Sequence, residues 1–220
     1  MNSNPPSPAV YTIILLRHGE SIGNADGFIQ GQADFPLTEL GRQQAQVLAA
    51  RWLAEGVTFD HVISSTLIRA RETAEIITSA LNIPVEYDPI WKERSFGQLE
   101  GMRDEDVELT DPGIDFWHPY HTIGKTGESM VDLYIRANQA VQNLLRRPIG
   151  RYLVVSHGAI LNMVLFSILG LSPQGRIHSP GFRFQNASFA TLTYIPDQRV
   201  WMVLGLNDHA HWIEEKAQET

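Results

Sequence analysis

Short apolar runs alternate with longer amphipathic segments along the chain. Residues 10–16 (VYTIILL) form an apolar, β-branched run without helical polarity, which predicts a strand buried on both faces. Similar runs predict five further strands, over residues 61–63, 85–87, 151–155, 188–195 and 200–205. The strand over 85–87 lies between Pro84 and Pro89, as is typical of an edge strand.

The longer segments repeat with a helical period. From Thr38 to Gly56, one stripe of a helix is predicted to collect Ala45, Leu48, Ala49, Trp52 and Leu53. Further helices are predicted over residues 67–81, 129–145 and 159–169. Strands that alternate with helices indicate an α/β fold, with a mostly parallel central sheet and helices on both faces. In such sheets, ligands bind at the carboxyl ends of the strands.

The length of 220 residues fits a single domain, expected over residues 10–213. A disordered leader over 1–9 and a tail over 214–220 are expected to flank it. The pattern weakens over 97–127, which is interpreted as an inserted lid or specificity segment.

Composition excludes several classes of function. The formal net charge of −8 disfavours nucleic-acid binding, so any phosphate pocket must be a local cluster of cations. The absence of cysteine excludes disulfides, thiolate metal sites and cysteine nucleophiles. The longest apolar stretch, 159–171, is interrupted and too short to span a bilayer, and residues 1–8 do not resemble a signal peptide. We therefore expect a cytoplasmic protein without membrane contact.

Two predicted strands end in a histidine followed by a glycine. His18 closes the run LLRHG, and His157 closes VVSHG, where Gly158 leaves room for a ligand. If the two strands are neighbours in the sheet, both histidines face one crevice. Arg17 is next to His18, and Arg69 lies in the first turn of the helix predicted over residues 67–81. The two arginines complete a pocket for a phosphoryl dianion.

This set of residues suits phosphoryl transfer. A neutral imidazole is a competent nucleophile toward phosphorus, and arginines stabilise the transition state. The leaving alkoxide needs a proton, and Glu93 in WKERSFGQLEG is the best-placed carboxylic acid. Glu20 and Glu100 are also near in sequence, and Glu20 is interpreted as a structural charge in the first turn of a helix.

Six segments, from Arg17 to His157, resemble the motifs of the histidine phosphatase superfamily in family order: RHGES with Asn24, PLTELGRQQA, SSTLIRARETAE, KERSFGQLEG, GES and VSHG. The resemblance implies a phosphoglycerate mutase-like three-layer sandwich.

The same resemblance implies roles for individual residues. His18 would accept the phosphoryl group, with Arg17, Arg69 and His157 binding it. Asn24 would add a hydrogen bond, and Glu93 would donate the proton. No metal or cofactor is implied for this step, and family members occur as monomers and dimers.

The resemblance leaves the reaction open between hydrolysis and isomerisation. The mutases carry paired arginines for a bisphosphate after the glutamate motif, whereas residues 102–126 hold only Arg103 and Lys125 as fixed cations. The leading hypothesis is therefore a phosphomonoester hydrolase that acts on a small phosphorylated metabolite. The alternatives are a cofactor-dependent phosphoglycerate mutase and a non-catalytic phosphate-binding module.

Several residues have two interpretations. Gln30, Gly31 and Gln32 could line the mouth of the pocket or form a plain connection. The aromatic and histidine side chains of 116–121 could form a lid or a satellite core. His209 and His211 alternate like metal ligands, but no third ligand is evident, so surface histidines are preferred.

Overall fold

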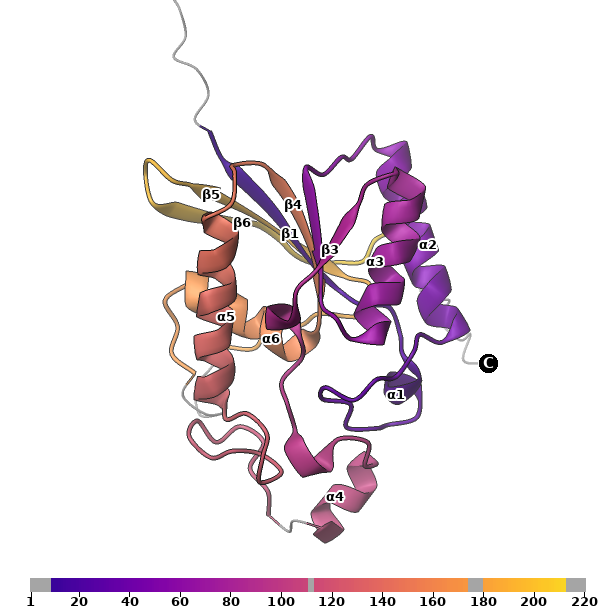
Figure 1. Ribbon diagram of the computed structural model, residues 1–220, viewed down its shortest axis with the longest axis vertical. Helices are drawn as coiled ribbons and strands as arrows, with labels where there is room; N and C mark the ends of the chain where they lie inside the picture. Colours follow the sequence, from indigo (N-terminus) through magenta and orange to yellow (C-terminus); the bar gives the residue numbers. More distant parts are fainter. Residues whose placement is uncertain (1–8, 111–112, 174–179, 213–220) are drawn as a thin grey trace, which may run out of the picture.

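The computed structural model describes residues 9–110, 113–173 and 180–212 (Figure 1). The strands are β1 (Tyr11–Arg17), β2 (His61–Ser64), β3 (Val85–Tyr87), β4 (Arg151–Ser156), β5 (Phe189–Ile195) and β6 (Val200–Asp208). The helices are α1 (Ile22–Ala25), α2 (Glu39–Ala54), α3 (Ile68–Leu81), α4 (Asp104–Thr110), α5 (Met130–Leu145) and α6 (Gly158–Ile168). Two 3-10 turns, η1 (Pro89–Trp91) and η2 (Gly97–Leu99), complete the elements. The tail expected over 214–220, and the leader except Ala9, lie outside the described residues.

The strands form one sheet in the order β3-β2-β4-β1-β5-β6. The first four strands are parallel, and β5 and β6 run antiparallel at one edge. The predicted α/β class with a mostly parallel sheet is therefore confirmed, and β3 lies at the other edge, as Pro84 and Pro89 indicated.

Helices cover both faces of the sheet because β1 is apolar at every position along its middle. Ile13 and Leu15 face a core that contains α5 and α6, whereas Ile14 and Leu16 face a second core under α2 and α3. Figure 1 shows these two helix pairs on opposite sides of the sheet.

The amphipathic pattern predicts the helix starts well and one buried residue wrongly. Thr38 caps α2 through a hydrogen bond from the Gly41 amide, and Ser129 forms a capping box with Asp132 at α5. Leu53, however, is 61% exposed. It lies at the border of the stripe, where Trp52 already fills the core and the helix is about to end.

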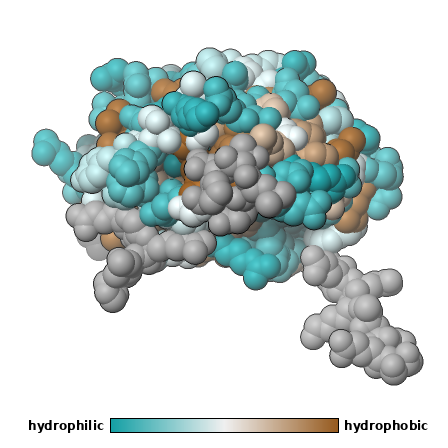
Figure 2. Space-filling model, turned by 90° about the horizontal axis from the view of Figure 1, so that it is seen from below, coloured by the Kyte–Doolittle hydropathy of each residue, from teal (hydrophilic) through white to brown (hydrophobic). Residues whose placement is uncertain are grey.

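The weakly patterned segment over 97–127 folds at the end of the molecule that carries α1 and α4 (Figure 1). A third, small core of Ile29, Leu99, Val107 and Ile123 holds it there. Viewed from this end, the surface is mainly hydrophilic, with hydrophobic side chains showing near its middle (Figure 2). None of the helices in the described part of the chain is long and apolar enough to cross a membrane.

Candidate active site

The parallel pairing of β1 with β4 brings the two histidine motifs together. Arg17 lies opposite Ser156 in the register, and the His18 amide donates to the Ser156 carbonyl at 3.0 Å. Both strands therefore end at the same level, and His18 and His157 follow side by side, with ring centroids 5.1 Å apart. The condition on which the predicted crevice depends is met.

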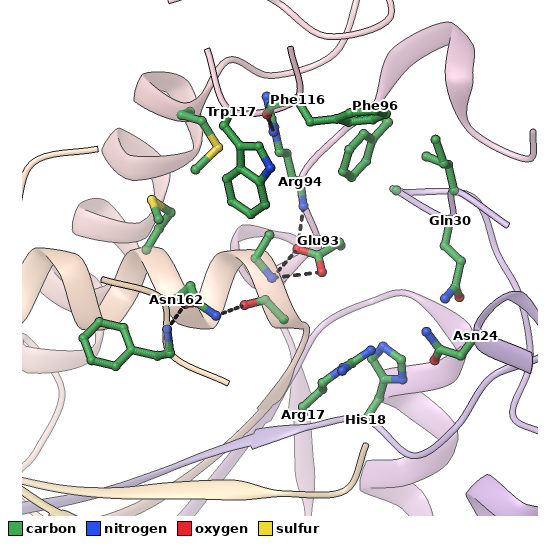
Figure 3. A pocket seen from close by; sticks show the side chains of 18 of the residues that line it. Arg17, His18, Asn24, Gln30, Glu93, Arg94, Phe96, Phe116, Trp117 and Asn162 are labelled. Atoms are coloured by element: carbon green, nitrogen blue, oxygen red, sulfur yellow. Dashed lines mark hydrogen bonds between the residues drawn. The ribbon is translucent and has the colours of Figure 1, made fainter. Parts of the chain in front are cut away.

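A cavity of about 880 Å³ opens beyond these strand ends (Figure 3). Most of the predicted site residues line it: Arg17, His18, Asn24, Gln30, Gly31, Arg69, Glu93 and Gly158. His157 lies behind His18, is fully buried and does not line the cavity, so the expectation that both histidines face one crevice is wrong for His157.

His18 is buried in a state that suits a nucleophile. Its Nδ1 lies 2.6 Å from the Gly19 carbonyl, which can only accept a hydrogen bond. Nδ1 therefore carries the proton, and Nε2 keeps its lone pair. Burial lowers the pKa of His18 well below 6.5, and the charges of Arg69 and Arg17 lower it further. The ring is neutral at pH 7.

His157 is held by the loop that follows β2. Its Nε2 lies 2.8 Å from the Ser65 hydroxyl, while its buried Nδ1 has no hydrogen-bond partner among the residues that the structure describes. Burial is the main cause that lowers the pKa of His157 well below 6.5, followed by the charge of Arg69. Two neutral rings thus lie beside two cations.

The two arginines are fixed by backbone carbonyls. Arg17 Nη1 donates to Phe184 O at 2.7 Å, and Arg69 donates to Ala33 O at 2.9 Å and Gly31 O at 2.7 Å. Burial lowers the pKa of both side chains, that of Arg69 to about 10, so both remain charged at neutral pH. Because these carbonyls carry no formal charge, the two positive charges remain available to an anion.

Glu93 lies at the N-terminus of α6. Its Oε1 accepts hydrogen bonds from the amides of Arg94 at 2.8 Å and Ile160 at 3.2 Å, and Ala159 donates to both carboxylate oxygens. A Cβ at Gly158 would lie 3.9 Å from both Arg17 Nε and Glu93 Oε2. Gly158 therefore marks the gap between cation and carboxylate, and any larger side chain there would narrow it.

The other two candidate carboxylates lie elsewhere. Glu20 was expected in the first turn of a helix, and this is wrong. It precedes Ser21, the N-cap of α1. It accepts a hydrogen bond from Thr38 at 2.8 Å and lines a different cavity. Glu100 accepts from the Ser95 hydroxyl and the Phe96 amide. Of these three carboxylates, Glu93 alone lines the cavity with His18.

Asn24 and Gln30 reach the cavity with their amide nitrogens available. The Ser21 hydroxyl lies 2.8 Å from Asn24 Oδ1 and 2.7 Å from Gln30 Oε1, which orients both side chains. Gln32 differs from the expectation. It does not line the cavity, because its Nε2 donates to the Glu93 carbonyl at 3.0 Å.

Arg136 of α5 forms a clamp around the Glu93 backbone that we did not predict from the sequence. Arg136 donates to three carbonyls, of Ile90 and Lys92 by Nη1 and of Glu93 by Nη2, the last at 3.0 Å. Its Nε and Nη2 also hold both carboxylate oxygens of Glu128. A signal was present, because Arg136 is a charged residue on the apolar stripe of its helix.

Arg94 was also missed. It is 3% exposed, lines the cavity, and donates to Glu128 O and Phe116 O. It thereby fixes the start of the aromatic segment over 116–121.

That aromatic segment divides between the two interpretations. Phe116 packs against the third core and also lines the cavity, as does Trp117. Tyr120 is 73% exposed and does not line the cavity, while the rings of His118 and His121 stack at 3.5 Å. Within the described ranges, no three His, Cys, Asp or Glu side chains gather in a way that could hold a metal ion.

Comparison with known proteins gives a consistent result. The family model for the histidine phosphatase superfamily (branch 1) matches residues 13–209. A curated relative from Yersinia enterocolitica, named "Probable phosphoglycerate mutase GpmB", is 34% identical over 94% of this chain and 93% of its own.

Solved structures agree with this result. The alpha-ribazole phosphatase of Shigella flexneri has a TM-score of 0.79 and 29% identity, over 92% of this chain and 99% of its own. A mycobacterial glucosyl-3-phosphoglycerate phosphatase has a TM-score of 0.76 and 26% identity, over 90% and 99%. The fold, the strand-end histidines and these matches together show that the chain is an enzyme of the histidine phosphatase superfamily, branch 1.

Proposed function

We propose that this enzyme hydrolyses phosphomonoesters of small metabolites through a phosphohistidine on His18. The observation that carries the proposal is the state of His18 in its pocket. The ring is neutral, Nδ1 donates a hydrogen bond to the Gly19 carbonyl, and the guanidinium groups of Arg17 and Arg69 lie nearby with no carboxylate among the described residues paired to them.

The first half-reaction transfers the phosphoryl group to the enzyme. Arg17 and Arg69 bind the phosphoryl oxygens, with Asn24, Gln30 and the Gly31 loop at the mouth, and His18 Nε2 attacks phosphorus. The P–O bond to the alcohol breaks, and the leaving oxygen takes a proton from Glu93, which enters this step in its carboxylic acid form. The Gly19 carbonyl stabilises the positive charge on the phosphorylated ring, because it accepts the hydrogen bond that Nδ1–H donates.

The second half-reaction regenerates the enzyme. Glu93, now a carboxylate, takes a proton from water as the water attacks the phosphohistidine. The P–N bond breaks, inorganic phosphate leaves, and His18 and Glu93 return to their initial states. His157 contributes from behind His18, where its neutral ring and its bond to Ser65 fix the floor of the pocket.

Water is the better acceptor because the rest of the cavity does not suit a second phosphate. Among the described residues that line it, Arg94 is the only cation beyond Arg17 and Arg69, so a second phosphate would meet one guanidinium where the phosphoryl pocket has two. Arg103 lies outside the cavity and donates to Asp26 O. Two structural relatives that carry the name phosphatase support the same choice.

The test is phosphate release from a panel of phosphomonoesters, including 3-phosphoglycerate with and without 2,3-bisphosphoglycerate. We expect release from several esters, no dependence on the bisphosphate, and full activity in EDTA. His18→Ala should fold normally and lose at least about 10³-fold in kcat, and the wild type quenched in turnover should carry an acid-labile phosphoryl group. Fast bisphosphate-dependent isomerisation with little release would identify a mutase instead.

A further inference from the structure

The cavity extends well beyond the phosphate pocket. Its volume of about 880 Å³ is in the upper part of the range that holds drug-sized ligands, and a phosphoryl group fills a small part of it. In Figure 3, Trp117, Phe116 and Phe96 lie on the far side of Glu93 from Arg17 and His18. The space beyond Glu93 is where the alcohol part of an ester must lie.

The wall of this outer space is apolar and continuous with the main core. Its aromatic and methionine side chains are Phe28, Phe96, Phe116, Trp117, Met130, Met163, Phe166 and Phe182. Met130, Met163 and Phe166 are 6%, 3% and 4% exposed and belong to the core between the sheet and helices α5 and α6. They are held in place by packing, so the wall is formed before a ligand arrives.

Two polar side chains on this wall already have backbone partners. Asn162 donates to Gly158 O at 2.9 Å and accepts from the Phe182 amide at 2.9 Å. Arg94 donates to Glu128 O through Nε and to Phe116 O through Nη1, which leaves its buried Nη2 as the one nitrogen of this guanidinium without a partner among the described residues. A hydroxyl-rich alcohol would therefore lose its water here and gain few new hydrogen bonds, whereas an apolar ring would gain contact area at no such cost.

Resting on the proposed function, we infer that the preferred substrates are phosphomonoesters whose alcohol part carries an apolar ring system, seated on the wall that Trp117 closes. Esters whose alcohol part is too small to reach this wall, or is rich in hydroxyl groups, are then hydrolysed at the same site with a lower kcat/KM.

Three esters of primary alcohols test this, because their leaving groups are chemically alike: ethyl phosphate, 2-(1-naphthyl)ethyl phosphate, and a 2-(glycosyloxy)ethyl phosphate of similar bulk. Burial of the naphthyl ring should raise kcat/KM about 100-fold over ethyl phosphate. The glycosyl ester should stay within about tenfold of ethyl phosphate. Equal kcat/KM for the naphthyl and glycosyl esters would overturn the inference.

Trp117→Ala tests the wall directly. It should lower the ratio of kcat/KM between the naphthyl and ethyl esters by about tenfold, because part of the contact area is lost. Tyr120→Ala is the matched control, an exposed aromatic residue of the same segment that does not line the cavity, and should leave the ratio unchanged. An equal effect of the two substitutions would contradict the assignment.

A binding measurement separates this inference from the proposed function. The phosphonates 2-(1-naphthyl)ethylphosphonate and ethylphosphonate have no ester bond to cleave, so their affinities in calorimetry do not depend on turnover. Tighter binding of the naphthyl compound without phosphate release from any ester would refute the hydrolase and retain the apolar site. Equal affinities of the two phosphonates, together with rapid phosphate release from the esters, would refute the apolar site and retain the hydrolase.

Discussion

At the scale of single residues, the site depends on side chains kept in unusual states of charge. His18 and His157 are buried as neutral rings next to Arg17 and Arg69, whose charges would repel a second proton. An imidazole in water is mostly protonated at a pH below its ordinary pKa. In the folded protein, the same two rings stay neutral there. The active site therefore makes the fold sensitive to acid.

The free energy of unfolding should fall as the pH decreases below about 6.5. The folded pKa of each histidine is lowered, so the unfolded chain binds protons that the folded chain does not. The loss approaches about 1.4 kcal/mol per pH unit for each histidine. Urea unfolding between pH 7.5 and 5 measures it, and His157→Gln should give a shallower slope than the wild type. Parallel slopes would contradict a neutral, buried His157.

The role of Glu93 predicts a dependence on the leaving group. Glu93→Gln cannot give up a proton, so kcat for alkyl phosphates should fall by about 10²–10⁴-fold. The loss should be much smaller for 4-nitrophenyl phosphate, whose leaving group needs no proton. Steady-state kinetics on both esters measure this, with Glu100→Gln as a control that lies outside the cavity. Full activity of Glu93→Gln on the alkyl ester would show that another group donates the proton.

Sequence motifs could predict which candidate residues meet at the cavity but not the residues that hold them. Arg17 ends β1, and His18 and His157 directly follow β1 and β4, whose hydrophobic patterns are strong, so their meeting point follows from sheet topology. Arg94 and Arg136 act through backbone carbonyls. The helical pattern marks Arg136 as unusual, but the carbonyls that either arginine contacts depend on loop paths that no local pattern encodes.

At the scale of elements, α5 has a second function besides covering the sheet. Its Arg136 donates hydrogen bonds to the carbonyls of Ile90, in η1, and of Glu93. It also pairs with the carboxylate of Glu128, which lies just before the helix. Arg136 thus fixes the Glu93 backbone, while amides at the start of α6 fix its carboxylate.

Arg136→Met should therefore misplace Glu93 without removing it. We expect kcat on alkyl phosphates to fall by about 10²-fold and kcat on 4-nitrophenyl phosphate to change much less, the pattern of a displaced proton donor. Arg136→Lys should recover part of the loss. Arg146→Met, at the exposed end of the same helix, should behave as the wild type. A uniform loss on both esters would indicate a general structural defect.

The predicted elements agree with the structure wherever one periodicity dominates, as in β1, α2 and α5. The start of the short helix α1 was predicted wrongly, with Glu20 in its first turn, because its four residues are too few to show a helical period and depend on the cap by Ser21. The segment over 97–127 also gave little information. Its third core collects side chains from distant loops, such as Ile29 and Ile123.

At the scale of the whole molecule, one sheet separates two cores, and each core has a buried tryptophan. Trp52 packs under α2 and α3, and Trp91 packs on the opposite face. Since every residue of the middle of β1 belongs to one core or the other, the two cores share a strand and should unfold together.

Trp52→Ala should lower the free energy of unfolding by about 3–5 kcal/mol, because it leaves a cavity between α2 and the sheet. Leu53→Ala, one position along and largely exposed, should change it by less than about 0.5 kcal/mol. Urea unfolding followed by tryptophan fluorescence and by circular dichroism should give a single coincident transition. Two separate transitions would show that the cores unfold independently.

The pairing of β1 with β4 has a kinetic consequence. Most of the chain lies between these two strands, so the loop that must close to align them is among the longest in the fold. Contacts so distant in sequence form late and slowly, whereas α2, α5 and α6 can form locally. During refolding, the rate of phosphate release should therefore recover later than the helical circular dichroism signal. The delay between the two measures the time that β1 and β4 need to pair.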